Sequence, residues 1–459
     1  MSSIIKFHSR EKLIKTLSPA EKGRDDANTD KYKKDHAKPT EWEQDTKSYF
    51  LSEFSTLVHK TAQEKINDSH KSIGDINRSS LISSIKNIPT DLLAALSKEE
   101  TVSKDVLQHY AHEKINGDKN YRSFILTHSL EGRKPEYPSS KLWFWAVLLG
   151  IVVIESIMNS YFLSKGSDLG LLGGFLSAFV ISVINVLWAV FAGFTFRYSN
   201  HKILYKRIGG WLSPVIFMTI AVLFAAFVGH YRDKLETDPF NAAVDAVVSF
   251  YDAPFALENV NSWFLFAISI IAFLIAAVDA YKSDDPYPGY GGVDRERVNR
   301  DNSMHEAKAE FYEKMGLATN SSRDDLGTVN KKIIQDVELF KGVIIESENL
   351  VDAYEKEKSV VQERFNGVIK IYRDKLSFVI GYNLAYFDEE PILPSSDFMN
   401  LELSAIQRDK QKVPDLDALI TDLPDIYDEV SKELNDIKSG LDTRVNVFVE
   451  QIIKSESNS

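Results

Sequence analysis

The sequence contains no cysteine, and this absence excludes several kinds of chemistry at once. None of its 459 residues can form a disulfide, a thiolate metal site, an iron–sulfur cluster or a cysteine nucleophile. The sequence also lacks the phosphate loop G-x-x-x-x-G-K-[ST], the dinucleotide pattern G-x-G-x-x-G, the zinc-protease pattern H-E-x-x-H and the hydrolase pattern G-x-S-x-G. We therefore predict that the protein is not an enzyme and needs no cofactor.

Two weaker chemical patterns have simpler interpretations. The segment GSDLG at 166–170 resembles the hydrolase pattern only superficially and falls in a predicted membrane hairpin turn. His109 and His112 are three residues apart, so with Glu113 they could share a helix face and hold a divalent metal. Because no further ligands lie nearby in the sequence, we interpret them as exposed polar residues and predict no metal site.

The sequence also has fewer basic residues than acidic residues. The chain has 54 Lys and Arg residues against 66 Asp and Glu residues, a formal net charge of -12. Nucleic acid is not an expected partner, because phosphate binding needs a dense basic surface. No alternating strand pattern competes with the helical periodicity, so we predict an all-α fold.

Apolar residues are concentrated between Leu142 and Tyr281. Four continuous runs there have the length of a membrane-spanning helix, about 18–25 residues. Continuous apolar runs, unlike alternating ones, predict helices. The runs are 142–163, 169–196, 211–228 and 263–280. We predict a four-helix transmembrane domain at 141–281, a cytosolic helical arm at 1–140, a linker at 282–302 and a helical or coiled-coil cytosolic arm at 303–459.

Basic residues indicate the orientation of these helices. They precede the first run, fill the loop at 197–207 and follow the fourth run, whereas the opposite side is mainly acidic and includes Asp168. We predict a multi-pass protein of the cell inner (plasma) membrane with both termini in the cytoplasm. Residues 1–17 lack the apolar core of a signal peptide, so the first arm is expected to stay where it is made. In the outer loop we expect a short helix at 240–251.

The two arms show helical patterns of their own. Residues 18–39 are charged and are predicted to be disordered. Thr40 and Glu43 form a capping pair for a helix reaching about Asn67, followed by short helices at 80–88, 92–96 and 102–116. A helix at 325–382 carries an apolar seam, for which we prefer a helical hairpin with 426–453 over a coiled coil between subunits. The seam comprises Val337, Phe340, Ile344, Ser347, Val351, Tyr354, Lys358, Val361, Phe365, Val368 and Tyr372.

Four polar residues interrupt the apolar runs, and such residues are candidate functional sites. Glu155 and Asn159 lie one turn apart in the first run, and we expect them to bond across to the second. We expect Asn185 to lie at a different depth and to bond the third or fourth helix, and Asp279 to lie near the inner end of the fourth. Glu155 is either a protonated, hydrogen-bonded residue that holds the helices together or a proton or cation site. Small residues in the second run predict close helix packing: Gly170, Gly173, Gly174, Ala178 and Ser182.

The segment after the fourth run combines stiff and flexible residues. Pro286, Pro288 and Gly289 belong to PYPGYGG, which either sets the exit angle of the helix or acts as a hinge between arm and membrane. We predict an oligomeric scaffold or sensor that binds a cytosolic protein and couples its arms to the lipid bilayer. The alternative is a gated ion channel or membrane-permeabilising effector, with a bacterial stress or phage-defence role.

Overall fold

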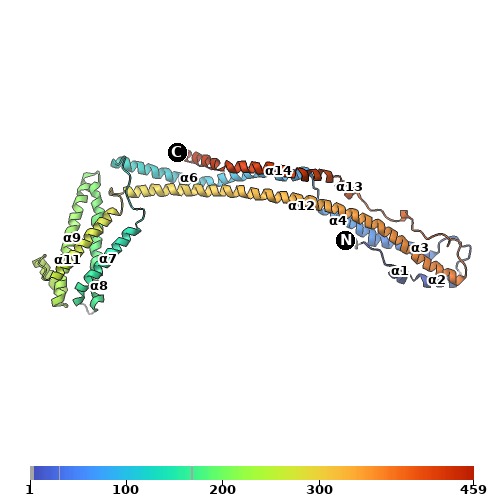
Figure 1. Ribbon diagram of the computed structural model, residues 1–459, viewed down its shortest axis with the longest axis horizontal. Coiled ribbons are helices and arrows are strands. Elements are labelled where there is room, and N and C mark those ends of the chain that lie inside the picture. Colours follow the sequence, from blue (N-terminus) through green and yellow to red (C-terminus); the bar gives the residue numbers. More distant parts are fainter. Residues whose placement is uncertain (1–4, 30, 167–168, 459) are drawn as a thin grey trace. The chain divides into compact units, whose positions relative to one another are not determined.

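A computed structural model of the chain describes residues 5–29, 31–166 and 169–458, and within them every regular element is a helix. The all-α prediction is therefore confirmed for these residues (Figure 1). Ser167 and Asp168, in the predicted hairpin turn, lie outside the described residues. Contacts divide the chain into two compact units, Met1–Glu99 with Glu313–Asp442, and Glu100–Tyr312 with Thr443–Ser459.

The helices of the N-terminal part are short until α6. They are α1 (Arg10–Leu17), α2 (Pro19–Asn28), α3 (Glu41–Phe54), a π-helical turn η1 (Ser55–His59), α4 (Lys60–Ser72), α5 (Arg78–Lys86) and α6 (Ile88–His128). The predicted cap of α3 is present, because the Thr40 hydroxyl accepts from the Glu43 amide and the Glu43 carboxylate accepts from the Thr40 amide. A single α6 replaces two of the predicted short helices.

Residues 18–39 were expected to be disordered, but α2 occupies much of this range. Pro19 sits at the first turn, where a missing amide hydrogen costs nothing. Asp26 is buried and accepts a 2.8 Å hydrogen bond from the Tyr372 hydroxyl. A side chain at Gly23 would come within 2.7 Å of the Tyr372 carbonyl. Tertiary contacts therefore order a segment whose composition alone predicts disorder.

The C-terminal part is built on one long helix, α12 (Tyr290–Ile380). It is longer than the predicted 325–382 because no proline occurs between Pro288 and Pro391. Gly381 ends it in a left-handed conformation with φ +77°. The chain continues through the turn η4 (Ser395–Asp397), α13 (Ser404–Lys410), α14 (Val413–Ser439) and α15 (Leu441–Asn458).

In the first unit, the predicted seam is buried largely against the N-terminal arm. Phe50 and Phe54 of α3 pack with Val361 and Phe365 of α12 in the main core. Figure 1 shows α3 and α4 alongside α12. α14 also contacts α12, for instance through Lys341 and Asp417. The predicted partner segment 426–453 contacts α12 ahead of the seam, through Asn435 and Arg323. The preferred hairpin is therefore wrong in its register, and α3 and α4 cover the later part of the seam. Periodicity predicts that a stripe is buried but not what covers it.

The second unit contains the four apolar helices: α7 (Leu142–Leu163), α8 (Gly170–Phe196), α9 (Leu204–Thr237) and α11 (Val260–Lys282). The 3-10 turn η2 (Ser164–Gly166) follows α7, and another, η3 (Arg197–Asn200), follows α8. The short helix α10 (Ala242–Asp252) packs on α9. α8 contacts each of the other three long helices, so the side chains on its buried face decide how the bundle packs.

Candidate functional site

Glu155 lies at the junction of three apolar helices. Its side chain is on α7 and only 2% of the residue is exposed. The Ser182 hydroxyl of α8 donates to one carboxylate oxygen at 2.6 Å, and the Asn185 amide donates to the other at 3.2 Å. The same Asn185 nitrogen donates to the Ser269 carbonyl of α11 at 2.8 Å. A carboxyl group held by neutral donors can join the helices and can also exchange a proton.

Two sequence-based expectations about this group are wrong, namely the bond of Asn159 to the second helix, which is absent among the described residues, and the separate depth of Asn185. Asn185 was expected to lie at a different depth from Glu155, yet it bonds Glu155. Its expected bond to the third or fourth helix is present, because it donates to α11. The apparent offset came from counting residues along straight antiparallel helices, whereas a side chain can reach about a turn along its neighbour. Asn159 is 1% exposed, and neither of its side-chain polar atoms has a hydrogen-bond partner among the described residues. Asp279 is half-buried on α11.

The small residues predicted to pack occupy different environments. Gly174 is in closest contact, because a side chain there would come within 2.4 Å of the Ser160 carbonyl of α7. Gly173, Ala178 and Ser182 are buried on the same helix. Gly170 is exposed and starts α8 with φ +56°. Gly174 therefore serves contact within the chain, so a substitution there disturbs the fold before it could report on assembly between chains.

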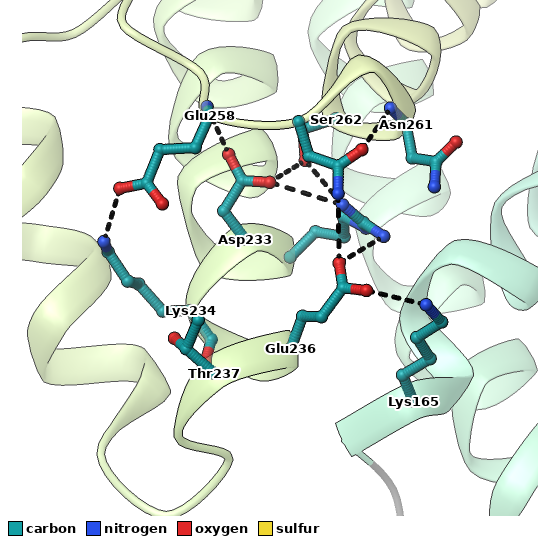
Figure 2. A network of polar contacts seen from close by, with 10 residues as sticks. Lys165, Asp233, Lys234, Glu236, Thr237, Glu258, Asn261 and Ser262 are labelled. Atoms are coloured by element: carbon teal, nitrogen blue, oxygen red, sulfur yellow. Dashed lines mark hydrogen bonds and ion pairs between the residues drawn. The ribbon is translucent and has the colours of Figure 1, made fainter.

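A second polar network, not singled out from the sequence, lies at the end of α9 (Figure 2). Arg232 is 1% exposed, and its guanidinium lies 2.8 Å from a Glu236 oxygen and 3.3 Å from Asp233. Asp233 accepts from the Ser262 hydroxyl at 2.5 Å and from the Glu258 amide at 2.8 Å. In Figure 2, Lys165 reaches Glu236 from the turn after α7, at 2.7 Å.

This network connects the ends of three apolar helices. The buried guanidinium is tolerated because its single positive charge lies next to two carboxylates, those of Asp233 and Glu236. In the sequence, these residues were considered only as charges on the outer side of the predicted membrane helices. The signal that could have found them is the i, i+4 spacing of Arg232 and Glu236 at the end of an apolar run, since such pairs share a helix face.

The segment expected to be either a fixed exit or a hinge is held by charged groups. The Asp285 side chain is fully buried and accepts from the Arg133 guanidinium at 2.9 Å and from the amides of Glu136 and Tyr287, each at 2.7 Å. Asp284 accepts two 2.8 Å hydrogen bonds from Arg295. Burial would raise the pKa of Asp284, but the Arg295 guanidinium and the Asp285 amide hold that pKa below its usual value.

Further contacts tie the same junction to its neighbours. Arg197, after α8, donates to the Tyr281 carbonyl at 2.9 Å and the Ser283 hydroxyl at 2.8 Å. The Tyr137 hydroxyl donates to Asp294 at 2.7 Å, and burial together with this bond raises the pKa of Tyr137 to about 12. These bonds join the ends of α8 and α11, the segment before α7 and the start of α12.

The three residues named as a hinge lie within this junction. Pro286 and Pro288 are half-buried in the turn between α11 and α12. Gly289 has φ +86°, a conformation that favours glycine, and α12 begins at the next residue. Tyr287 and Tyr290 flank the turn and are buried against Leu130. The turn is thus packed against the segment that follows α6.

Comparisons with protein-family models, with curated protein sequences and with solved structures gave no match. Within the described residues, no group of three or more His, Cys, Asp or Glu side chains could hold a metal ion. Four helices are long and apolar enough to cross a membrane, which fits a multi-pass helical membrane protein.

Proposed function

We propose that this protein is a membrane scaffold or sensor that couples helical cytosolic arms to a four-helix membrane domain. It acts as an oligomer in the plasma membrane, with both termini in the cytoplasm and a cytosolic protein as partner. The observation that carries the proposal is the junction around the buried Asp285, where ion pairs and hydrogen bonds join the ends of α8 and α11 to the start of α12.

The physical argument rests on stiffness. A flexible linker of polar residues would average out any movement of an arm before it reached the membrane helices. A buried carboxylate with three donors resists such averaging, because separating the groups would leave buried charge unpaired. α12 starts at this junction and continues to Ile380. A partner that moves α12 would therefore also displace the ends of α8 and α11.

The absence of native cysteine allows a direct test with spin labels. Single cysteines replace two exposed residues of the second unit, Leu187 on α8 and Asn299 on α12. In bilayers, we expect one narrow distribution of label distances, and a broad one when Asp285→Ala is added. Asp301→Asn on α12, outside the junction, is the control and should keep the narrow distribution. A broad distribution without any junction substitution would refute rigid coupling.

Orientation and assembly have separate tests. A membrane-impermeant maleimide added to intact cells should label a cysteine at Asn241, in the loop before α10, but not one at Asn320 on α12. Labelling only at Asn320 would reverse the proposed orientation. The mass of the detergent-solubilised particle, from light scattering, should be a multiple of the 52.0 kDa chain. A monomer at all concentrations would remove the oligomeric part of the proposal.

The second candidate, a gated channel, is favoured by one specific observation. Glu155, Asn185 and the unbonded side chain of Asn159 are all buried within the apolar helices. Intramembrane polar groups of this kind often line ion or proton paths. Cation flux through liposomes containing the protein, abolished by Glu155→Gln but unaffected by Lys165→Gln in the other network, would support the channel. No flux under any voltage or pH gradient would exclude it.

A further inference from the structure

A basic cavity opens beside the junction, at the ends of the helices on the side predicted to face the cytoplasm. It has a volume of about 480 Å³ and is lined by His128, Ser129, Arg133, Asn200, Lys202 and Tyr287, among others. Lys202 lies between η3 and α9, and Tyr287 lies between α11 and α12. The cavity is therefore formed where three apolar helices end, at the level expected for lipid headgroups.

Two cations line this cavity, and not all of their donor hydrogens are used within the described residues. The Lys202 ammonium donates to the Thr127 carbonyl at 3.2 Å and to the Ser129 hydroxyl at 2.8 Å, which uses two of its three hydrogens. Arg133 donates through one terminal nitrogen to Asp285, while its side chain stays 34% exposed. Within the described residues, the remaining donors of both cations are available to a ligand that brings acceptors and negative charge.

The residue that accepts a hydrogen bond from Lys202, Ser129, has a strained backbone conformation. It follows the last residue of α6 with φ +54°, a left-handed conformation that favours glycine. The Leu130 amide bonds the Ile125 carbonyl at 3.0 Å, which is the hydrogen bond of a helix end that usually has glycine at this position. A serine is strained there, but glycine could not provide the hydroxyl that accepts from Lys202.

The electrostatic surroundings favour an anion. Lys206 lies close enough that it, Lys202 and burial together lower the pKa of His128, with burial the largest cause. Asp285, which pairs with Arg133 beside the cavity, is fully buried and already accepts three hydrogen bonds. Asn200 donates to the Pro286 carbonyl at 3.0 Å and thereby holds the wall of the cavity.

We propose that this cavity binds a phosphate ester, presented by an anionic phospholipid whose acyl chains lie along the apolar helices. Charge-assisted hydrogen bonds from a lysine and an arginine to phosphate oxygens match this chemistry. Basic pockets between membrane helices on the cytoplasmic side are suited to phospholipid headgroups. The site goes beyond the coupling role and does not require it.

The test measures binding of short-chain phosphatidic acid to the detergent-solubilised full chain, by native mass spectrometry. Lys202→Gln should weaken binding about tenfold, the value of one charge-assisted hydrogen bond. Lys282→Gln is the matched control, because Lys282 is exposed at the end of α11 and does not line the cavity. It should change binding by less than about twofold. Equal losses in both variants would mean general attraction to basic surface and would overturn the site.

Ser129→Gly separates binding from folding. Relief of the left-handed strain should raise the thermal stability of the protein, whereas loss of the hydroxyl that positions Lys202 should weaken lipid binding about threefold. Stabilisation without any loss of binding would refute the role of Lys202 placement. Soluble glycerol phosphate distinguishes the source of the phosphate. We expect it to bind far more weakly than the lipid, and equal affinity would overturn the assignment to phospholipid.

Discussion

The two buried asparagines of the apolar helices should lose different amounts of stability on the same substitution. Asn159 and Asn185 are each 1% exposed. Asn185 donates to Glu155 and to the Ser269 carbonyl, whereas the Asn159 side chain has no partner among the described residues. Replacing each by alanine removes the same atoms, so the two variants differ mainly in the hydrogen bonds that are lost.

The magnitudes follow from that difference. Truncation to alanine leaves a small cavity in both cases, with a cost of about 1 kcal/mol. Hydrogen bonds between membrane helices contribute about 0.6 kcal/mol on average and up to about 1.7 kcal/mol. Asn185→Ala loses two such bonds, one of them to a carboxyl group. We therefore expect Asn185→Ala to lower the free energy of unfolding by about 2–3 kcal/mol, and Asn159→Ala by about 1 kcal/mol or less.

A double-mutant cycle with Glu155→Ala, which removes the oxygen that accepts from Asn185, cancels the cavity cost of each single substitution. The free energy of unfolding is measured by titrating a denaturing detergent into protein held in a mild one. Asn185 and Glu155 should show a coupling energy of about 1 kcal/mol, and Asn159 and Glu155 a coupling near zero. Equal losses for the two single variants, or coupling only through Asn159, would refute the hydrogen-bond assignment around Glu155.

Three further predictions concern other parts of the chain. Gly174→Ala should lower the melting temperature, because the new carbon would meet the Ser160 carbonyl at 2.4 Å, whereas Gly209→Ala, in open space on α9, should raise the stability by about 0.5–1 kcal/mol. Phe365→Ala should cost the first unit about 3–5 kcal/mol, measured by chemical denaturation, and a loss below about 1 kcal/mol would contradict its place in the core. Burial and neighbouring Lys206 lower the pKa of both His128 and His201 below the ordinary 6.5, so the folded state binds fewer protons than the unfolded state. The contribution of these two histidines to the free energy of unfolding should therefore be fully present above pH 6.5 and should be lost as the pH falls toward their lowered pKa values. The loss should be smaller in His201→Asn, and an unchanged pH profile of stability in that variant would contradict the assignment.

The candidate site was only partly predictable from the sequence. Glu155 stands out because a carboxylate within an apolar run is costly, and Ser182 stands out through its four-residue spacing from Ala178. Their 2.6 Å hydrogen bond could be anticipated as a contact between the first two helices. The bond from Asn185 to Glu155 could not, because it depends on the rotation and tilt of both helices, and these are set by packing among all four.

Composition and periodicity by themselves determined the features that depend on local physics. Every long apolar run became a helix, since a backbone that crosses lipid must satisfy its own hydrogen bonds. The seam from Val337 to Tyr372 became buried, since apolar side chains at helical spacing share one face. The capping pair at Thr40 and Glu43 acts within a single turn and is likewise local.

Only the tertiary structure decided which surfaces meet. The seam of α12 is covered largely by α3 and α4, and the charged turn before α12 is fixed by Arg133, which lies far from it in the sequence. The basic cavity at Lys202 likewise combines three separate segments. Hydrophobic burial and ion pairing do not specify which segment of the chain is the partner, because any apolar face or opposite charge of suitable shape can make the contact. Their partners are therefore selected by the packing of the whole chain.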